Sequence, residues 1–271
     1  MSKRNSQSSK AAARERLRIE REKQAKKEKA RRQVIVAASA LGILAVAGGI
    51  GFAVVQAGKP SAWEAAADAK SVSAPKNTEG TDGTTVIVGK PEAKQTLEIY
   101  EDSRCPVCAT FEQGVGSTVE KDVADGKYKL KYVGATFIDN SDQGEGSKNA
   151  LSALGAALDV SPEAFLKYKA ALYSTEFHPE ERDDKFAKDS YLLKVADSVP
   201  ALKGNAEFKK NVEGGTFDAW AMKMSKTFDD SGVRGTPTLK MDGKTLTAEG
   251  SENPPLTVEQ FNAALSKVLK G

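Results

Sequence analysis

The sequence predicts an α/β domain that carries a helical insertion and is preceded by one transmembrane helix. Three observations lead to this prediction. A run of 22 residues, 34–55, contains no charged residue. Segments that read as strands follow at 84–89, 95–102 and 127–138, and the last two alternate polar and apolar residues, as half-buried strands do. Between the last of these segments and a final hairpin, residues 145–230 show only helical periodicity.

The basic residues of the chain are concentrated at its start. Residues 1–32 hold 13 Lys and Arg against 4 Asp and Glu, whereas the remainder holds 27 against 33. The net charge of +3 therefore reflects a basic tail attached to a mildly acidic domain, which does not indicate a nucleic-acid partner. We interpret the tail as a solvated cytoplasmic segment that sets topology. Contact with nucleic acid or lipid headgroups is the alternative.

The apolar run is long enough to cross a lipid bilayer. At about 1.5 Å per residue its helix spans roughly 33 Å, which matches the hydrocarbon core. We therefore expect a transmembrane helix over 33–57, with the basic tail in the cytoplasm and the domain outside. A cleaved signal peptide that ends at Ala57 is the alternative. Signal peptides usually have a shorter apolar region and a shorter basic leader.

The composition changes again after the apolar run. Residues 58–84 are rich in Gly, Pro, Ser, Thr and Ala, so we expect a flexible linker with at most one short helix, at 61–70. The folded domain should then comprise 85–271. Its first helix should begin at Cys105 and end near Gly126.

The second half of the domain should be mainly helical. Helical patterns occur at 145–158, 162–173, 183–198, 204–212 and 216–230. After them, Asp242-Gly243 between two short strands predicts a type I′ hairpin. Thr257 and Gln260 fit a capping box for a C-terminal helix, and Gly271 follows its last turn.

The two cysteines of the chain, Cys105 and Cys108, lie where a predicted strand meets a predicted helix. A structural disulfide usually links distant segments, because its stabilising effect grows with loop length. A zinc site normally needs four ligands, and the chain has a single histidine, His178, and no second cysteine pair. We therefore interpret His178 as a loop residue and predict no bound metal or organic cofactor.

Redox chemistry remains for the cysteine pair. Residues three apart on a helix have Cα atoms about 5 to 6 Å apart, which a disulfide tolerates. Pro106 fits the first helical position. Cys105 would then sit at the positive end of the helix dipole, where free N–H groups stabilise a thiolate.

Neighbouring charges should tune this thiolate. Arg104 should stabilise it. Glu101 and Asp102 should destabilise it, unless one of them accepts the proton of Cys108. We expect Cys105 to be the attacking nucleophile and Cys108 to be the resolving thiol.

Three parts of the sequence carry a resemblance to a known family. They are LEIYEDSRCPVCATFE, VRGTPTLKMDGK and the helical block between them. Together they resemble the thioredoxin superfamily, and within it the DsbA-like thiol:disulfide oxidoreductases, over about 85–270. The resemblance implies a thioredoxin-like fold with a cis bond at Thr236-Pro237. It also implies that Pro237 packs against the cysteine pair and that the backbone of Thr236 can pair with a substrate segment.

The sequence departs from the strongest oxidases of this family at Val107, where they often have histidine. An imidazole at this position can stabilise the Cys105 thiolate, and valine cannot. We therefore expect a less oxidising disulfide than in relatives with Cys-Pro-His-Cys, which leaves the direction of electron flow open.

We predict a membrane-anchored, extracytoplasmic thiol:disulfide oxidoreductase. It should oxidise cysteine pairs in secreted or cell-surface proteins, and the resemblance implies a quinone-linked membrane partner that re-oxidises Cys105 and Cys108. An extracytoplasmic reductase or isomerase is one alternative. A membrane-tethered, chaperone-like binding module, in which the cysteines are incidental, is another.

Overall fold

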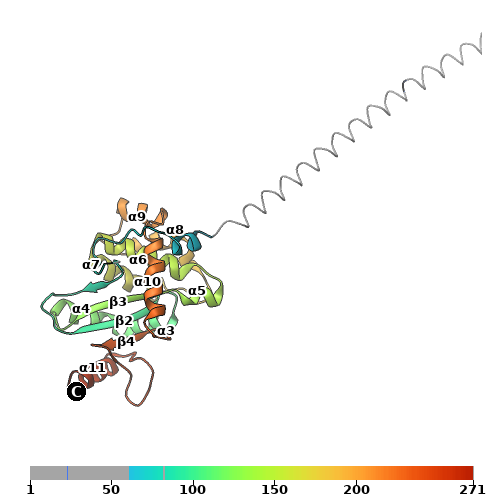
Figure 1. The fold of residues 1–271 in the computed structure, drawn as a ribbon. Coiled ribbons are helices and arrows are strands. Elements are labelled where there is room, and N and C mark those ends of the chain that lie inside the picture. Colours follow the sequence, from blue (N-terminus) through green and yellow to red (C-terminus); the bar gives the residue numbers. More distant parts are fainter. Residues whose placement is uncertain (1–22, 24–60, 82, 271) are drawn as a thin grey trace, which may run out of the picture. The chain divides into compact units, whose positions relative to one another are not determined.

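The fold was analysed in a computed structural model, which describes residue 23, residues 61–81 and residues 83–270 (Figure 1). The chain divides into two compact units, Met1–Pro60 and Ser61–Gly271. All helices and strands named below belong to the second unit.

The predictions for the start of the chain fall outside the described residues. They concern the basic tail, apart from Lys23, and the transmembrane helix at 33–57. Within the part of the chain that the structure describes, no helix is long and apolar enough to cross a membrane. The membrane anchor therefore stays a prediction.

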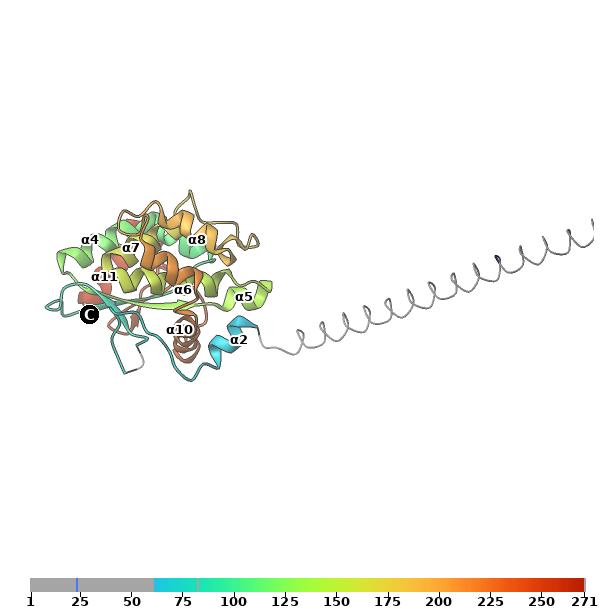
Figure 2. The same ribbon diagram turned by 90° about the horizontal axis from the view of Figure 1, so that it is seen from above.

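A five-stranded sheet with the strand order β1-β3-β2-β4-β5 forms the centre of the domain (Figure 1). The central strands β2 and β3 are parallel, and every other neighbouring pair is antiparallel. Helices lie on both sides of the sheet (Figure 2), which explains why the last residues of β2 and β3 are buried without alternation. The strands are β1 (Val86–Val88), β2 (Thr96–Asp102), β3 (Lys129–Ala135), β4 (Thr238–Met241) and β5 (Lys244–Thr245).

The elements between β3 and β4 are all helical, as the periodicity of this region predicts. This insertion contains α5 (Phe137–Asp142), α6 (Gly146–Val160), α7 (Pro162–Leu172), the 3₁₀ turn η2 (Lys185–Ala187), α8 (Asp189–Ala196), α9 (Ala206–Glu213) and α10 (Asp218–Asp230). The remaining helices are α2 (Ala62–Ala67), α3 (Pro106–Phe111), the π-helical turn η1 (Glu112–Gly116), α4 (Ser117–Asp125) and α11 (Val258–Lys270). The expected α/β domain with a helical insertion is confirmed.

The helix predicted from Cys105 to Gly126 forms, but a π-helical turn divides it into α3, η1 and α4. A Cβ atom at Gly114, within η1, would lie 2.4 Å from the carbonyl oxygen of Leu256. Only glycine therefore lets the segment before α11 approach this turn so closely. Gly126 ends α4 with a left-handed φ of 82°, which glycine adopts without strain.

Two boundaries predicted from the sequence are wrong. The strand expected at 127–138 ends at Ala135, and the chain then turns into α5. A carboxylate oxygen of Asp102 accepts the N–H of Ile138 at 3.2 Å. A side chain distant in the sequence thus provides the hydrogen-bond partner for a free N–H group in the first turn of this helix. The single helix expected at 183–198 is likewise divided, into η2 and α8.

In its described part, the linker expected at 58–84 contains the one short helix that the sequence allowed. Ser61 and Glu64 form a capping box that begins α2. Farther along, the N–H and the Nζ of Lys76 each lie 2.9 Å from a carboxylate oxygen of Asp159, at the end of α6. The composition indicated flexibility, but this segment packs because its polar groups find partners in the helical insertion.

The final hairpin and helix follow the predicted turn chemistry in part. Asp242 and Gly243 have φ values of 49° and 83°, as a type I′ turn requires. The hydroxyl of Thr257 accepts the N–H of Gln260 at 3.3 Å. The Gln260 side chain accepts from the N–H of Leu256 and not from that of Thr257, so only half of the expected capping box forms.

Candidate active site

The cysteine pair lies where β2 leads into α3. Cys105 is the N-cap residue of α3, and Pro106 occupies the first helical position. The Sγ of Cys105 accepts the N–H of Cys108 at 3.4 Å, in the manner of an N-cap side chain. The backbone therefore presents an N–H group of the first turn to the sulfur, as the sequence predicted.

A second segment meets this junction from the start of β4. The peptide bond between Thr236 and Pro237 is cis, as the resemblance implied. The carbonyl oxygen of Thr236 lies 3.4 Å from the Sγ of Cys105. Pro237 is buried beside this contact, and its predicted role in substrate binding stays a prediction.

The two thiols have opposite acidities. Hydrogen bonds from the Cys108 thiol and from the N–H groups of Cys108 and Val107 lower the pKa of Cys105 to about 6, although burial opposes this shift. Burial, and then the hydrogen bond to Cys105, raise the pKa of Cys108 well above its ordinary value. Cys105 is 6% exposed and Cys108 is fully buried. Only Cys105 is therefore equipped to attack from solvent.

Val107 separates the two cysteines and projects outward. Its side chain is 42% exposed, and Phe137 at the start of α5 is 36% exposed. Ile138, next to Phe137, belongs to the same buried cluster as the two cysteines. Val107 is therefore an exposed apolar side chain directly between the two cysteines.

Glu101 lies behind the cysteine pair in a buried ionic cluster. Its carboxylate is 3.1 Å from the Nζ of Lys169 in α7, and the same Nζ contacts Glu112 of η1. Burial raises the pKa of Glu101 to about 8, although Lys169 lowers it. The charge of Glu101 in turn raises the pKa of Cys108, so the two groups compete for a proton. The sequence indicated Glu101 but gave no sign of Lys169 or Glu112.

Asp102, the other candidate acceptor, has a structural role. Its carboxylate accepts the Ser147 hydroxyl at 2.6 Å and the N–H groups of Arg104 and Ile138 at 3.0 and 3.2 Å. Burial raises its pKa to about 7. These three bonds hold the end of β2 against the first turns of α5 and α6.

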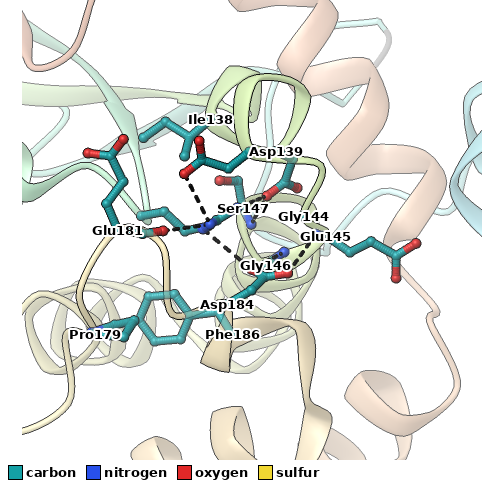
Figure 3. Close-up of polar contacts among 12 residues, drawn as sticks. Ile138, Asp139, Gly144, Glu145, Gly146, Ser147, Pro179, Glu181, Asp184 and Phe186 are labelled. Carbon is teal, nitrogen blue, oxygen red and sulfur yellow. Dashed lines mark hydrogen bonds and ion pairs between the residues drawn. The ribbon is translucent and has the colours of Figure 1, made fainter.

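Arg104 is buried directly before the cysteine pair. Its guanidinium lies 2.9 Å from Asp139, 3.4 Å from Asp184 and 3.7 Å from Asp142. Figure 3 shows Asp139 and Asp184 converging at the start of α6, with Glu181 on the opposite side. These contacts balance the charge of Arg104 within the helical insertion. Its predicted effect on the thiolate stays a prediction, since it is not among the groups named above that lower the pKa of Cys105.

Several buried polar atoms around the cysteine pair have no hydrogen-bond partner in the described part of the chain. They are Oε1 of Glu101, Oη of Tyr173, Nε2 of His178 and Oγ1 of Thr236. Tyr173 packs in one apolar cluster with both cysteines. Unsatisfied buried groups are rare in folded proteins and concentrate at functional sites, so their position supports this region as the active site.

The fold and this site define the class of protein. A cysteine pair that begins a helix, next to a cis-proline that begins the antiparallel neighbour of the preceding strand, is the arrangement of the thioredoxin fold. A family model described as thioredoxin matches residues 81–267, and the chain belongs to this family.

Solved structures similar to this chain narrow the class to DsbA-type proteins. The oxidised Mtb DsbA is 25% identical, with a TM-score of 0.51, and the match covers 63% of this chain and 83% of that chain. The reduced disulfide bond oxidoreductase DsbG of Mycobacterium tuberculosis is 26% identical, with a TM-score of 0.52 and coverages of 66% and 83%. BdbD of Bacillus subtilis is 22% identical, with a TM-score of 0.56, and the match covers 73% of this chain and 99% of that chain. At this identity the likeness shows the fold alone. The predicted DsbA-like membership of the thioredoxin superfamily is confirmed.

Sequence relatives are of two kinds. The serine/threonine-protein kinase PknE of Mycobacterium tuberculosis is 27% identical over 157 residues, which make up 56% of this chain and 27% of the kinase. Disulfide bond formation protein D of Bacillus subtilis is 24% identical over 161 residues, 59% of this chain and 68% of that protein. The chain therefore spans about a quarter of the length of the kinases that it matches.

Proposed function

We propose that this protein is a thiol:disulfide oxidoreductase that works through a reversible disulfide between Cys105 and Cys108. The observation that carries the proposal is the opposite acidity of the two thiols. One pKa is lowered to about 6 at the start of a helix, and the other is raised by complete burial. A thiol with a low pKa is largely thiolate at neutral pH and is also a good leaving group.

The proposed reaction oxidises a pair of substrate thiols. A substrate thiolate attacks the Sγ of Cys105 in the enzyme disulfide, a mixed disulfide forms, and Cys108 leaves as a thiolate. A second substrate thiolate then attacks the substrate sulfur of the mixed disulfide and releases Cys105 as a thiolate. The substrate loses two electrons, and the enzyme pair gains them. The low pKa of Cys105 favours its release in the second step.

Glu101 is the proposed proton donor and acceptor for Cys108. The Cys108 thiolate that forms in the first step is unstable, because burial raises the pKa of this thiol. Glu101 has a pKa of about 8 and therefore carries a proton at neutral pH that it can donate. Lys169 and Glu112 complete the cluster and stabilise the carboxylate that remains.

Substrates are proposed to be unfolded or extended segments with cysteine pairs. The exposed apolar side chain of Val107 lies between the two cysteines, and the backbone before Pro237 is the proposed pairing partner for a substrate strand. We propose an extracytoplasmic domain anchored by the apolar run at 33–57, with secreted proteins as substrates and a quinone-linked membrane protein as re-oxidant. The charge pattern of the N-terminus supports this topology.

The reduction potential of the purified protein tests this proposal. The protein is equilibrated in glutathione buffers, and its thiols are trapped and counted. Oxidising members of this superfamily lie near about −120 to −180 mV, and thioredoxin lies near about −270 mV. A value at the oxidising end supports disulfide donation. A value near or below about −250 mV supports the reductase alternative instead. A pair that does not cycle overturns the enzyme proposal and leaves the tethered binding module.

A further inference from the structure

The only histidine of the chain lies against the cysteine pair, although it belongs to the loop between α7 and η2. The ring of His178 stacks on that of Tyr173, with 5.8 Å between centroids and 19° between planes. Its edge meets Phe186 at 6.1 Å. Because Tyr173 packs in the same buried cluster as Cys105 and Cys108, the imidazole forms the next layer outward from the two sulfur atoms.

The loop that carries His178 is fixed at two points, to the active site by Arg104 and to α8 by Tyr191. Arg104, the residue before the catalytic cysteine, donates from Nη2 to the carbonyl of Glu181 at 2.6 Å. Figure 3 shows Glu181 and Pro179 to the left of Gly146 and Ser147, the first labelled residues of α6. The Tyr191 hydroxyl donates to the carbonyl of Phe177 at 2.8 Å. The imidazole is therefore held in one position relative to Cys105.

The hydrogen bonds of the ring distinguish its two protonation states. Nδ1 lies 2.8 Å from the carbonyl oxygen of Pro179, and a carbonyl only accepts, so Nδ1 carries a proton. Nε2 is buried and has no hydrogen-bond partner in the described part of the chain. Burial lowers the pKa of His178 below its ordinary value, and the hydrogen bond to the Pro179 carbonyl offsets only part of this shift. At the unpartnered Nε2, a neutral ring has a buried lone pair, whereas an imidazolium has a buried N–H.

We propose that His178 is a positioning residue of the redox site, whose imidazolium, stacked on Tyr173 next to the cysteine pair, stabilises the reduced cysteine pair relative to the disulfide. This inference rests on the redox function proposed above. The physical reason is charge. Reduction creates a thiolate on Cys105, whereas the disulfide is neutral, so a cation beside this residue favours the reduced state.

Of the ionisable groups near the His178 ring, Cys105 is the one whose charge changes when the cysteine pair is reduced. The ionisable groups around the ring and its loop are Tyr173 of α7, Glu180 and Glu181 of the same loop, Lys185 of η2, and Arg104, Cys105 and Cys108 at the start of α3. Burial raises the pKa values of Tyr173 and Cys108, which stay neutral. Arg104 is paired with carboxylates, and Lys185 with Asp183.

Thermodynamic linkage between the two sites means that the inference can be tested by the titration of His178 itself. If the imidazolium favours the Cys105 thiolate, then the thiolate must favour the imidazolium by the same factor. The full-length protein, labelled at histidine, gives a single imidazole signal that can be followed by NMR from pH 4.5 to 8 in both redox states. We expect the proton affinity of His178 to be at least about threefold higher in the reduced form.

Two variants test the same coupling from the side of the cysteines. His178→Gln keeps a hydrogen-bond donor but carries no charge. His178→Phe keeps an aromatic ring that can stack on Tyr173, but it has neither the donor nor the charge. At pH 6, where the wild-type ring is partly protonated, we expect both to shift the glutathione equilibrium about twofold towards the disulfide, which corresponds to a potential about 9 mV more negative. At pH 8, where the wild-type ring is neutral, the shift should vanish.

The outcomes separate this inference from the function on which it rests. If the wild-type pair does not cycle between dithiol and disulfide, the proposed function fails, and the inference fails with it. If the pair cycles but the titration curve of His178 is identical in both redox states, only the inference is overturned. Equal potentials for the wild type and both variants at pH 6 would also overturn it. Because the NMR titration uses the wild-type protein, a variant that does not fold leaves the test intact.

Discussion

The carbonyl oxygen of Thr236 lies 3.4 Å from the Sγ of Cys105, although 131 positions separate the two residues in the chain. The contact exists because β4 pairs antiparallel with β2, with Tyr100 opposite Thr238. The end of β2 and the start of β4 therefore meet at the same edge of the sheet. This edge also carries the start of α3, so backbone groups from two distant segments surround one sulfur atom.

The roles of the two cysteines can be separated by substitution. Cys105→Ser should abolish the oxidation of a model dithiol peptide, because the accessible sulfur is lost. Cys108→Ser should retain the nucleophile but not the resolving thiol, so mixed disulfides with substrate should accumulate. Mass spectrometry of the two variants after exposure to an oxidised peptide measures this difference. Adducts of equal abundance on both variants would contradict the assignment.

The acidity of Cys105 predicts a pH dependence. Alkylation of the reduced protein by iodoacetamide should follow thiolate formation, with a midpoint near the pKa of about 6 and not near that of an ordinary cysteine. The same shift determines how the stability of the reduced protein depends on pH. A depressed pKa stabilises the reduced native state above the ordinary cysteine pKa, and this contribution is lost as the pH falls to about 6.

Cys105→Ser provides the reference for this stability effect. The free energy of unfolding of the reduced wild type, relative to that of the variant, should increase between about pH 6 and the ordinary cysteine pKa of about 8.5. Urea denaturation at several pH values measures it. A flat difference over this range would show that the native thiol is not acidified.

Glu101→Gln should slow the chemistry of the buried thiol. The substitution removes the carboxylic acid that is the proposed proton donor to Cys108. We expect the rate of the step in which Cys108 leaves to fall by about tenfold, with a weaker pH dependence around pH 8. Stopped-flow measurement of enzyme reduction by a peptide thiol tests this expectation.

Glu98→Gln is the matched control for this variant. Glu98 lies on the same strand and is paired with Lys131 at 3.2 Å, away from the sulfur atoms. This variant should react at the wild-type rate. Equal rates for all three proteins would remove Glu101 from the proton-transfer step.

Arg104→Met should destabilise the whole domain. The guanidinium is buried and faces Asp139, Asp184 and Asp142, and its removal leaves these carboxylates without their cation. Breaking a buried ion pair on one side costs about 3 kcal/mol or more. Urea unfolding measures this loss.

Lys226→Met is the reference substitution for Arg104. Lys226 pairs with Asp230 on an exposed face of α10, so its loss should cost less than about 1 kcal/mol. Similar costs for the two substitutions would show that the Arg104 cluster contributes little to the attachment of the helical insertion.

Local patterns were sufficient for the elements and for the nucleophile. Alternation predicted β2 and β3, helical periodicity predicted the insertion, and Pro106 indicated where α3 begins. These predictions depend on neighbours within a few residues, and the periods of 2 and 3.6 are visible in the sequence. Errors arose where a distant partner decided the outcome, as at Ile138, whose N–H bonds to Asp102 and belongs to a helix and not to a strand.

Cys105, Cys108 and the strand–helix junction that makes them a redox candidate could thus be identified from sequence alone. The partners of these residues could not. Lys169 and His178 occur in segments with ordinary helical or loop composition, and they approach the cysteines because α7 and the loop after it fold back over the β2–α3 junction. Burial then changes the acidity of each group, since charge is costly in an apolar interior. Which groups meet, and how strongly they act on one another, depends on packing between segments that no local pattern records.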